Sequence, residues 1–154
     1  MRWLHRLALW SALAGCLAAC AVALLTVASI VGRQAGRPIQ GDVELSQFGI
    51  ALCIALCLPW CQLRRANIIV DFFTQKVPPA MNRALDALGA LLLALMVALL
   101  AWRSTVGAQA VREAGETTMI LGLPMWLSYA ALAPGLALTA LVAFAQAVGW
   151  EGKE

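Results

Sequence analysis

The stretch LALWSALAGCLAACAVALLTVASIVG, residues 7–32, contains no charged side chain and is long enough to cross a lipid bilayer as one helix. A transmembrane helix needs about 20 consecutive apolar residues. Three further stretches without Asp, Glu, Lys or Arg follow along the chain, at 45–63, 87–102 and 117–150. The sequence therefore predicts an all-α integral membrane protein with four transmembrane helices.

The composition of the 154-residue chain agrees with this prediction. Hydrophobic residues make up 62% of the chain and charged residues 12%, and the mean hydropathy is +0.83. So little polar surface could not cover an apolar core of that proportion in water. We predict a single membrane domain, residues 1–154, in contact with membrane lipid. Its approximate spans are 7–31, 45–63, 82–102 and 124–148.

Tryptophan and proline residues indicate where these spans end. Amphipathic tryptophan rings gather where a membrane meets water, and five of the six tryptophans lie at or just beyond the ends of the apolar stretches: Trp3, Trp60, Trp102, Trp126 and Trp150. Because proline is favoured in the first turn of a helix, we expect the fourth span to begin at Pro124. Pro134 and Gly135 then fall inside that span, where a proline often kinks a helix.

The basic residues predict the orientation of the spans. With four spans both termini lie on one side, and that side holds seven basic residues: Arg2, Arg6, Arg64, Arg65, Lys76, Arg83 and Lys153. The other side holds four: Arg33, Arg37, Arg103 and Arg112. By the positive-inside rule, both termini are expected to be cytoplasmic. No basic run with interleaved aromatic residues indicates a nucleic-acid partner.

The N-terminus allows a second interpretation. Arg2 and Arg6 precede an apolar stretch that contains Leu13-Ala14-Gly15-Cys16, which is similar to a bacterial lipoprotein signal with its lipid-accepting cysteine. Cleavage there would leave three spans. However, the apolar stretch continues through Val31, whereas the apolar region of a signal peptide has about 7–15 residues. An uncleaved first helix is the prediction that we retain.

Five cysteines recur at helical spacing. Cys53, Cys57 and Cys61 lie on one stripe of the second span, which Gly49 extends, and Cys16 and Cys20 lie on one stripe of the first. Small residues at every fourth position are typical of close helix packing in lipid. His5 is the only histidine and no C-x-x-C pair occurs, so we expect neither a metal nor a cofactor. A thiol–quinone oxidoreductase is the enzyme alternative, and it would need exposed cysteine pairs on the outer side.

The segment between the second and third spans reads RRANIIVDFFTQKVPP, residues 64–79. Its apolar residues fit one face of a helix, after a basic pair and before two prolines. We therefore predict a short helix lying at the cytoplasmic interface of the membrane.

With these features, the chain resembles the small membrane subunit of tripartite ATP-independent periplasmic (TRAP) transporters, the DctQ-like small permease. Glu44 opens the second span, and Arg64 precedes Asn67-Ile68-Ile69-Val70-Asp71, a segment similar to the His-Ile-x-Val-Asp-like stretch of that family. Asn67 is a departure, because the family usually has histidine there. Pro124-Met125-Trp126, followed by Tyr129, resembles the Pro-x-Trp-x-x-Tyr segment of the family.

The resemblance implies a multi-pass subunit of the bacterial inner membrane that is not an enzyme. In that family a periplasmic binding protein delivers an organic acid, and a large permease subunit carries the substrate and sodium sites. The small subunit packs on the large one and supports it in the membrane. This chain would then hold no catalytic, substrate-binding or metal-ligating residues of its own. An orphan four-helix membrane scaffold or assembly factor is the alternative from another functional class.

Polar residues and helix-breaking residues near the ends of the spans are the candidates for the contact with the large subunit. These candidate interface residues are Glu44, Arg64, Asn67, Asp71, Glu116, Pro124 and Trp126. The candidate helix-packing residues are Gly49, Cys53, Cys57, Cys61, Cys16 and Cys20.

Overall fold

The structure is a computed structural model that describes residues 2–64 and 79–149. Its helices are α1 (Arg2–Gln34), α2 (Asp42–Leu63), α4 (Pro79–Ala114) and α5 (Trp126–Ala147). All four are long and apolar enough to cross a membrane. The prediction of an all-α protein with four membrane-spanning helices is confirmed. The predicted interfacial helix, with Asn67 and Asp71, lies outside the described residues.

Of the helix ends that differ from the expected span boundaries, two bear on the site. α4 continues past Trp102 to Ala114, and it stops at Gly115, whose positive φ of 66° is the left-handed conformation that ends many helices. α5 begins at Trp126 and not at Pro124. Pro124 instead pairs with Thr117 in an isolated antiparallel β-bridge, which keeps it in the connection before the helix.

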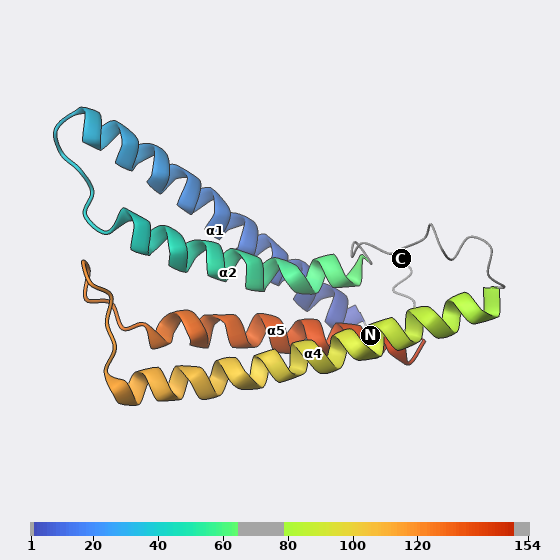
Figure 1. Cartoon of the computed structure of the whole chain (residues 1–154). Helices are drawn as coiled ribbons and strands as arrows, with labels where there is room; N and C mark the ends of the chain where they lie inside the picture. The colour runs from blue at the N-terminus through green and yellow to red at the C-terminus, as the bar shows by residue number, and fades with distance from the viewer. Residues whose placement is uncertain (1, 65–78, 150–154) are drawn as a thin grey trace.

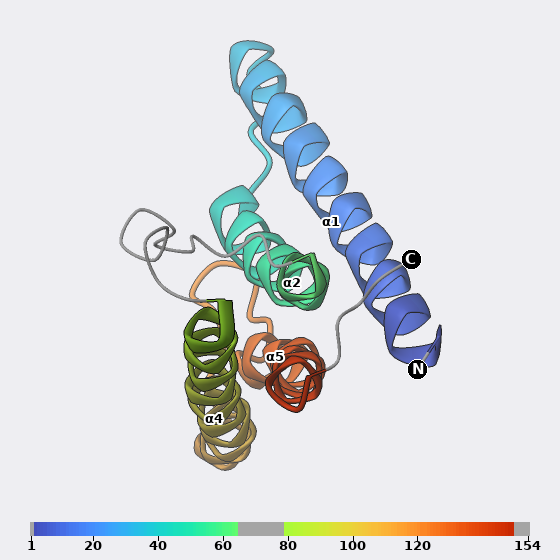
Figure 2. The same cartoon turned by 90° about the vertical axis from the view of Figure 1, so that its right-hand side faces the viewer.

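The helices form an open row in the order α1, α2, α5, α4. α1 packs antiparallel to α2, and α4 packs antiparallel to α5, as Figure 1 shows. The two hairpins meet where α2 packs against α5, while α1 makes only slight contact with α5. The end view in Figure 2 places α1 and α4 at opposite ends of the row.

The two ends of this row are named by what they carry. The connections 35–41 and 115–125 lie at one end, which we call the loop end (left in Figure 1). Arg2 and Ala147 lie toward the opposite end, which we call the termini end. α2 and α5 both run from the loop end to the termini end, so these two central helices are parallel.

Small residues occupy the contacts between the helices. Ala8, Ala55 and Ala143 are fully buried, and Val142 is among the largest side chains with no exposed surface. Large apolar side chains mostly point outward, as with Leu17 at 72% exposed. In lipid such exposure carries no penalty, and close approach of small residues supplies much of the attraction between helices. The row therefore presents an apolar exterior for lipid or another membrane protein.

The joint between the two hairpins depends on Gly135 of α5. A Cβ atom added there would lie 2.2 Å from the backbone oxygen of Ala55 and 3.1 Å from the Cβ of Ala55. Thr139, one turn further, is 2% exposed, and its hydroxyl donates to the carbonyl oxygen of Gly135 at 2.8 Å. Because Gly135 has no side chain, the backbone of α5 lies directly against the backbone of Ala55. The two helices therefore approach more closely than a larger residue at position 135 would permit.

Candidate functional site

Glu44 fastens the connection between α4 and α5 to the beginning of α2. Its two carboxylate oxygens accept hydrogen bonds from the backbone amides of Ile120, at 2.9 Å, and Leu121, at 3.0 Å. The Leu121 side chain lies over Gly41, where an added Cβ would be 2.4 Å from its Cγ. Sequence reasoning selected Glu44 as a contact for another subunit, and the structure gives it partners within its own chain.

The connection that Glu44 holds is a compact hairpin. The amide of Thr118 donates to the carbonyl of Leu123 at 2.8 Å, and the amide of Leu123 donates to the Thr118 hydroxyl oxygen at 3.0 Å. Met119 at its tip is fully exposed and Ile120 is 61% exposed. The hairpin therefore displays two apolar side chains at the loop end on a backbone that hydrogen bonds hold in place.

Two other predicted residues, Glu116 and Trp126, lie at the base of this hairpin. The backbone carbonyl of Glu116 accepts a hydrogen bond from the amide of Met125 at 3.0 Å, and its side chain is exposed. The Arg112 guanidinium lies 5.4 Å from the centroid of the Trp126 ring, a cation–π distance. The structure thus brings Glu44, Glu116, Pro124 and Trp126 to one end of the row.

A polar cluster at the loop end was missed by sequence reasoning. Asp42, the first residue of α2, accepts a hydrogen bond from the hydroxyl of Ser29 and pairs with the Arg33 guanidinium at 2.5 Å. Ser29 is 2% exposed, although it lies within the apolar stretch of α1. The cluster ties α1 to α2. Its only sequence signal was an acidic residue just before the second span, and Arg33 was counted solely as a topology charge.

The termini end has its own contacts. The Arg64 guanidinium lies 4.9 Å from the centroid of the Trp60 ring, and the ring of His5 meets the same indole edge-on with centroids 5.2 Å apart. Arg64, a predicted interface residue, therefore packs on an aromatic residue of its own helix. Asn67 and Asp71, the predicted interface residues that follow it in the sequence, are outside the described residues.

A second missed feature joins α2 to α5 at this end. The side-chain amide of Gln62 donates to the side-chain oxygen of Gln146 at 2.8 Å, and the amide of Gln146 donates to the Gln62 carbonyl at 2.9 Å. Both residues are 6% exposed. Each is an isolated glutamine near the end of an apolar stretch, and that isolation was the available signal.

The predicted packing residues divide into a group at the contact between α1 and α2 and a group of exposed cysteines. Gly49 faces α1, because an added Cβ would lie 2.2 Å from Val22, and Cys53 and Cys57 are half-buried. A Cβ on Gly15 of α1 would lie 2.7 Å from the Sγ of Cys57. The cysteines of the other group are exposed: Cys16, Cys20 and Cys61. Gly15, one residue before Cys16, therefore marks the stripe of α1 that meets α2.

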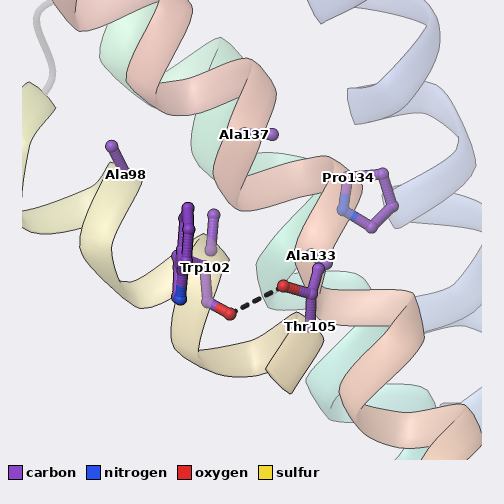
Figure 3. Close-up of a pocket in the computed structure, with 7 residues that line it drawn as sticks. Ala98, Trp102, Thr105, Ala133, Pro134 and Ala137 are labelled. Carbon is purple, nitrogen blue, oxygen red and sulfur yellow. Dashed lines mark hydrogen bonds between the residues drawn. The ribbon is translucent and has the colours of Figure 1, made fainter. Parts of the chain in front are cut away.

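A shallow groove lies between α4 and α5, with a volume of about 430 Å³. Figure 3 shows Thr105 beside Ala133, with its hydroxyl donating to the carbonyl of Trp102 at 2.6 Å. Because its own helix satisfies this hydroxyl, the groove is apolar in character and suits a hydrocarbon or small-residue surface. The lining residues are Ala98, Ala101, Trp102, Thr105, Ala133, Pro134 and Ala137. Within residues 2–64 and 79–149, no group of three or more His, Cys, Asp or Glu could hold a metal ion.

Neither the search of curated proteins nor the search of solved structures found a match. A family model described as "Tripartite ATP-independent periplasmic transporters, DctQ component" matches residues 22–151, which include α2, α4, α5 and the C-terminal part of α1. A match over most of the chain, together with four helices that can span a membrane, shows that this multi-pass membrane protein belongs to the DctQ family of TRAP transporter small permease components.

Proposed function

We propose that this chain is the small subunit that packs on and supports the large permease of a TRAP transporter. The complex would take up an organic acid, coupled to sodium, after a periplasmic binding protein delivers it. The substrate and sodium sites would lie in the large permease, so the small subunit would contribute structure and not catalysis. The observation that carries the proposal is the DctQ family match over residues 22–151.

The shape of the molecule supports a partner-dependent role. Four helices in an open row leave both outer helices, α1 and α4, with long apolar faces that no other described helix covers. Helices in membranes associate when contacts through small residues or polar groups are more favourable than contacts with lipid. An open row with an exposed edge at each end is suited to lie against a larger membrane protein.

We still propose that the polar residues near the helix ends contribute to the subunit contact, but in other roles than the sequence indicated. We propose that Glu44 supports the subunit contact indirectly, by holding the hairpin that presents Met119 and Ile120 at the loop end. Trp126 and Arg64 would lie at the headgroup level of the two membrane surfaces. Asn67 and Asp71 stay proposed contacts from the segment after α2.

Co-expression of this chain with a large TRAP permease from the same organism tests the proposed function. We expect the two subunits to co-purify, and we expect sodium-driven uptake of an organic acid into proteoliposomes to require both subunits and the binding protein. The control is the large subunit reconstituted alone. Full uptake without this chain, or no association of the two subunits, would leave the orphan scaffold as the better description.

The proposed orientation in the bacterial inner membrane places both termini in the cytoplasm. The basis is the seven-to-four division of basic residues between the two sides. A reporter fused after Glu154 and one inserted between Lys76 and Met81 should both read cytoplasmic, while one inserted near Gly115 should read periplasmic. A periplasmic signal from the Glu154 fusion would overturn the proposed topology.

A further inference from the structure

α4 has two opposite seams of residues. The seam that meets α5 carries Ala94, Ala101 and Ala108, seven residues apart and all less than 10% exposed. The opposite seam, which we call the outer seam, consists of exposed residues at alternating spacings of four and three: Leu92, Met96, Leu99, Arg103, Val106 and Ala110. This spacing keeps residues on one face of a helix and is the pattern that packs against a second helix.

Arg103 lies well away from the loop end along the axis of α4, as the contacts of α4 with α5 show. At the loop end Arg112 lies over Trp126, and further along, a Cβ on Gly107 would contact Tyr129 at 3.8 Å. The groove in Figure 3 then brings Thr105 beside Ala133. Because α4 and α5 are antiparallel, Arg103 is level with Pro134 of α5. At 1.5 Å per residue, Pro134 is about 12 Å from Trp126 along the axis of α5.

The same level is near the middle of α2. Gly135, next to Pro134, meets the backbone of Ala55, and α2 extends from Asp42 to Leu63. Sequence analysis placed Arg103 at the outer surface, because the apolar stretch ends at Trp102. The packing of α4 on α5 instead aligns Arg103 with the interior of α5 and not with its end. Arg103 therefore lies within the depth that the two central helices span, on a face that α5 does not cover.

An arginine at this depth requires an anionic partner. Across the part of the chain that the structure describes, the side chain of Arg103 has neither a hydrogen bond nor an ion pair. A charge inside the hydrocarbon region is costly unless another group pairs with it, and such residues usually face protein or water. Long basic side chains reach the headgroups from helix ends, but Arg103 is about two helical turns from Trp126, which the proposed function places at headgroup level.

We propose that the outer seam of α4 is the docking surface for a transmembrane helix of the large permease that carries a carboxylate at the level of Arg103. The proposal rests on the proposed function, since it specifies the partner's surface. Guanidinium and carboxylate groups form paired, directional hydrogen bonds that neutralise both charges away from water. The exposed Leu99 and Val106, one turn to either side of Arg103, would supply the apolar contacts around that pair.

Substitution of Arg103 in the co-expressed complex tests the charge pair. Arg103→Ala and Arg103→Glu should lower the yield of co-purified large subunit about tenfold or more, because each leaves the partner carboxylate without its cation. Arg103→Lys keeps the charge and should retain assembly within about threefold of the original chain. The matched control is Arg37→Ala, an exposed arginine of the connection 35–41, which should assemble normally. Unchanged co-purification of the Ala and Glu variants would overturn the proposal.

Crosslinking in the otherwise unaltered chain gives a second measurement that does not depend on a charge change. A photoreactive phenylalanine analogue at Leu99 or Val106 should crosslink to the large permease, and one at Leu24 of α1, at the other end of the row, serves as the comparison. Crosslinks from Leu99 and Val106 to lipid alone would overturn the outer seam as a docking surface. Failure of the original chain to bind any large permease would instead contradict the proposed function, so the two failures are distinguishable.

Discussion

Replacing Gly135 by alanine is expected to separate α2 from α5 and to lower the stability of the isolated subunit by about 3 kcal/mol or more, at the upper end of the usual cost of overpacking. The added Cβ would lie 2.2 Å from the backbone oxygen of Ala55, and a backbone atom cannot rotate away as a side chain can. Because α2 and α5 form the main joint between the two hairpins, the whole row should loosen. Thermal unfolding in detergent, followed by circular dichroism, measures the effect.

Gly89→Ala is the matched control for this experiment. Gly89 also lies inside a long helix, α4, but nothing lies within 4 Å of the position of its added Cβ. Since alanine favours helix more than glycine does, that variant should be as stable as the original or slightly more so. Equal stability of the Gly135 and Gly89 variants would mean that the close approach at Ala55 does not hold the hairpins together.

Replacing Glu44 by alanine is expected to release the α4–α5 hairpin from the beginning of α2. The two amides that the carboxylate binds would lose their acceptor, so hydrogen exchange at Ile120 and Leu121 should accelerate by about tenfold or more through local opening. Glu44→Gln keeps one amide oxygen as an acceptor and should show a smaller effect. Hydrogen exchange with mass spectrometry on the isolated subunit gives the measurement.

Glu116→Ala is the control in the same hairpin. It removes the same charge, but the contribution of Glu116 to the hairpin is made by its backbone carbonyl, which alanine retains. Exchange at Ile120 and Leu121 should therefore be unchanged. If Glu44→Ala alters only the complex with the large permease and leaves exchange in the isolated subunit as before, Glu44 acts as a direct contact between subunits and not as an internal clasp.

Both predictions bear on how the subunit could support a partner. The contact at Gly135 sets the relative positions of the two hairpins. The hydrogen bonds that Glu44 accepts from the connection between α4 and α5 set the position of the exposed Met119 and Ile120. Loss of either should therefore reduce assembly with the large permease.

The four spans were predictable because membrane insertion depends on local composition. Each span needs enough consecutive apolar residues, and 7–32 meets that condition without any knowledge of its neighbours. Glu44 was also selected from its position at the beginning of a span. The family motifs around Glu44, Arg64 and Trp126 indicated the family for the same reason, since motifs are read along the chain.

The partners of these residues could not be predicted, because they come from distant parts of the chain. Gln62 bonds Gln146 across 84 positions, and Glu44 binds amides 76 and 77 positions away. Hydropathy also assigned Arg103 to the membrane surface. The proposal that Arg103 lies below that surface depends on the register of α4 on α5, which no apolar stretch encodes.

The sequence by itself determined the class of protein, the number of spans and the family, because apolar length and local motifs decide them. Only the tertiary structure decided the open row of helices, the hydrogen bonds of Glu44 within its own chain and the alignment of Arg103 with the interior of α5. These depend on the register between helices, which small residues such as Gly49 and Gly135 permit, because a Cβ added at either position would lie 2.2 Å from an atom of the neighbouring helix. Register is a property of pairs of helices, and no single span encodes it.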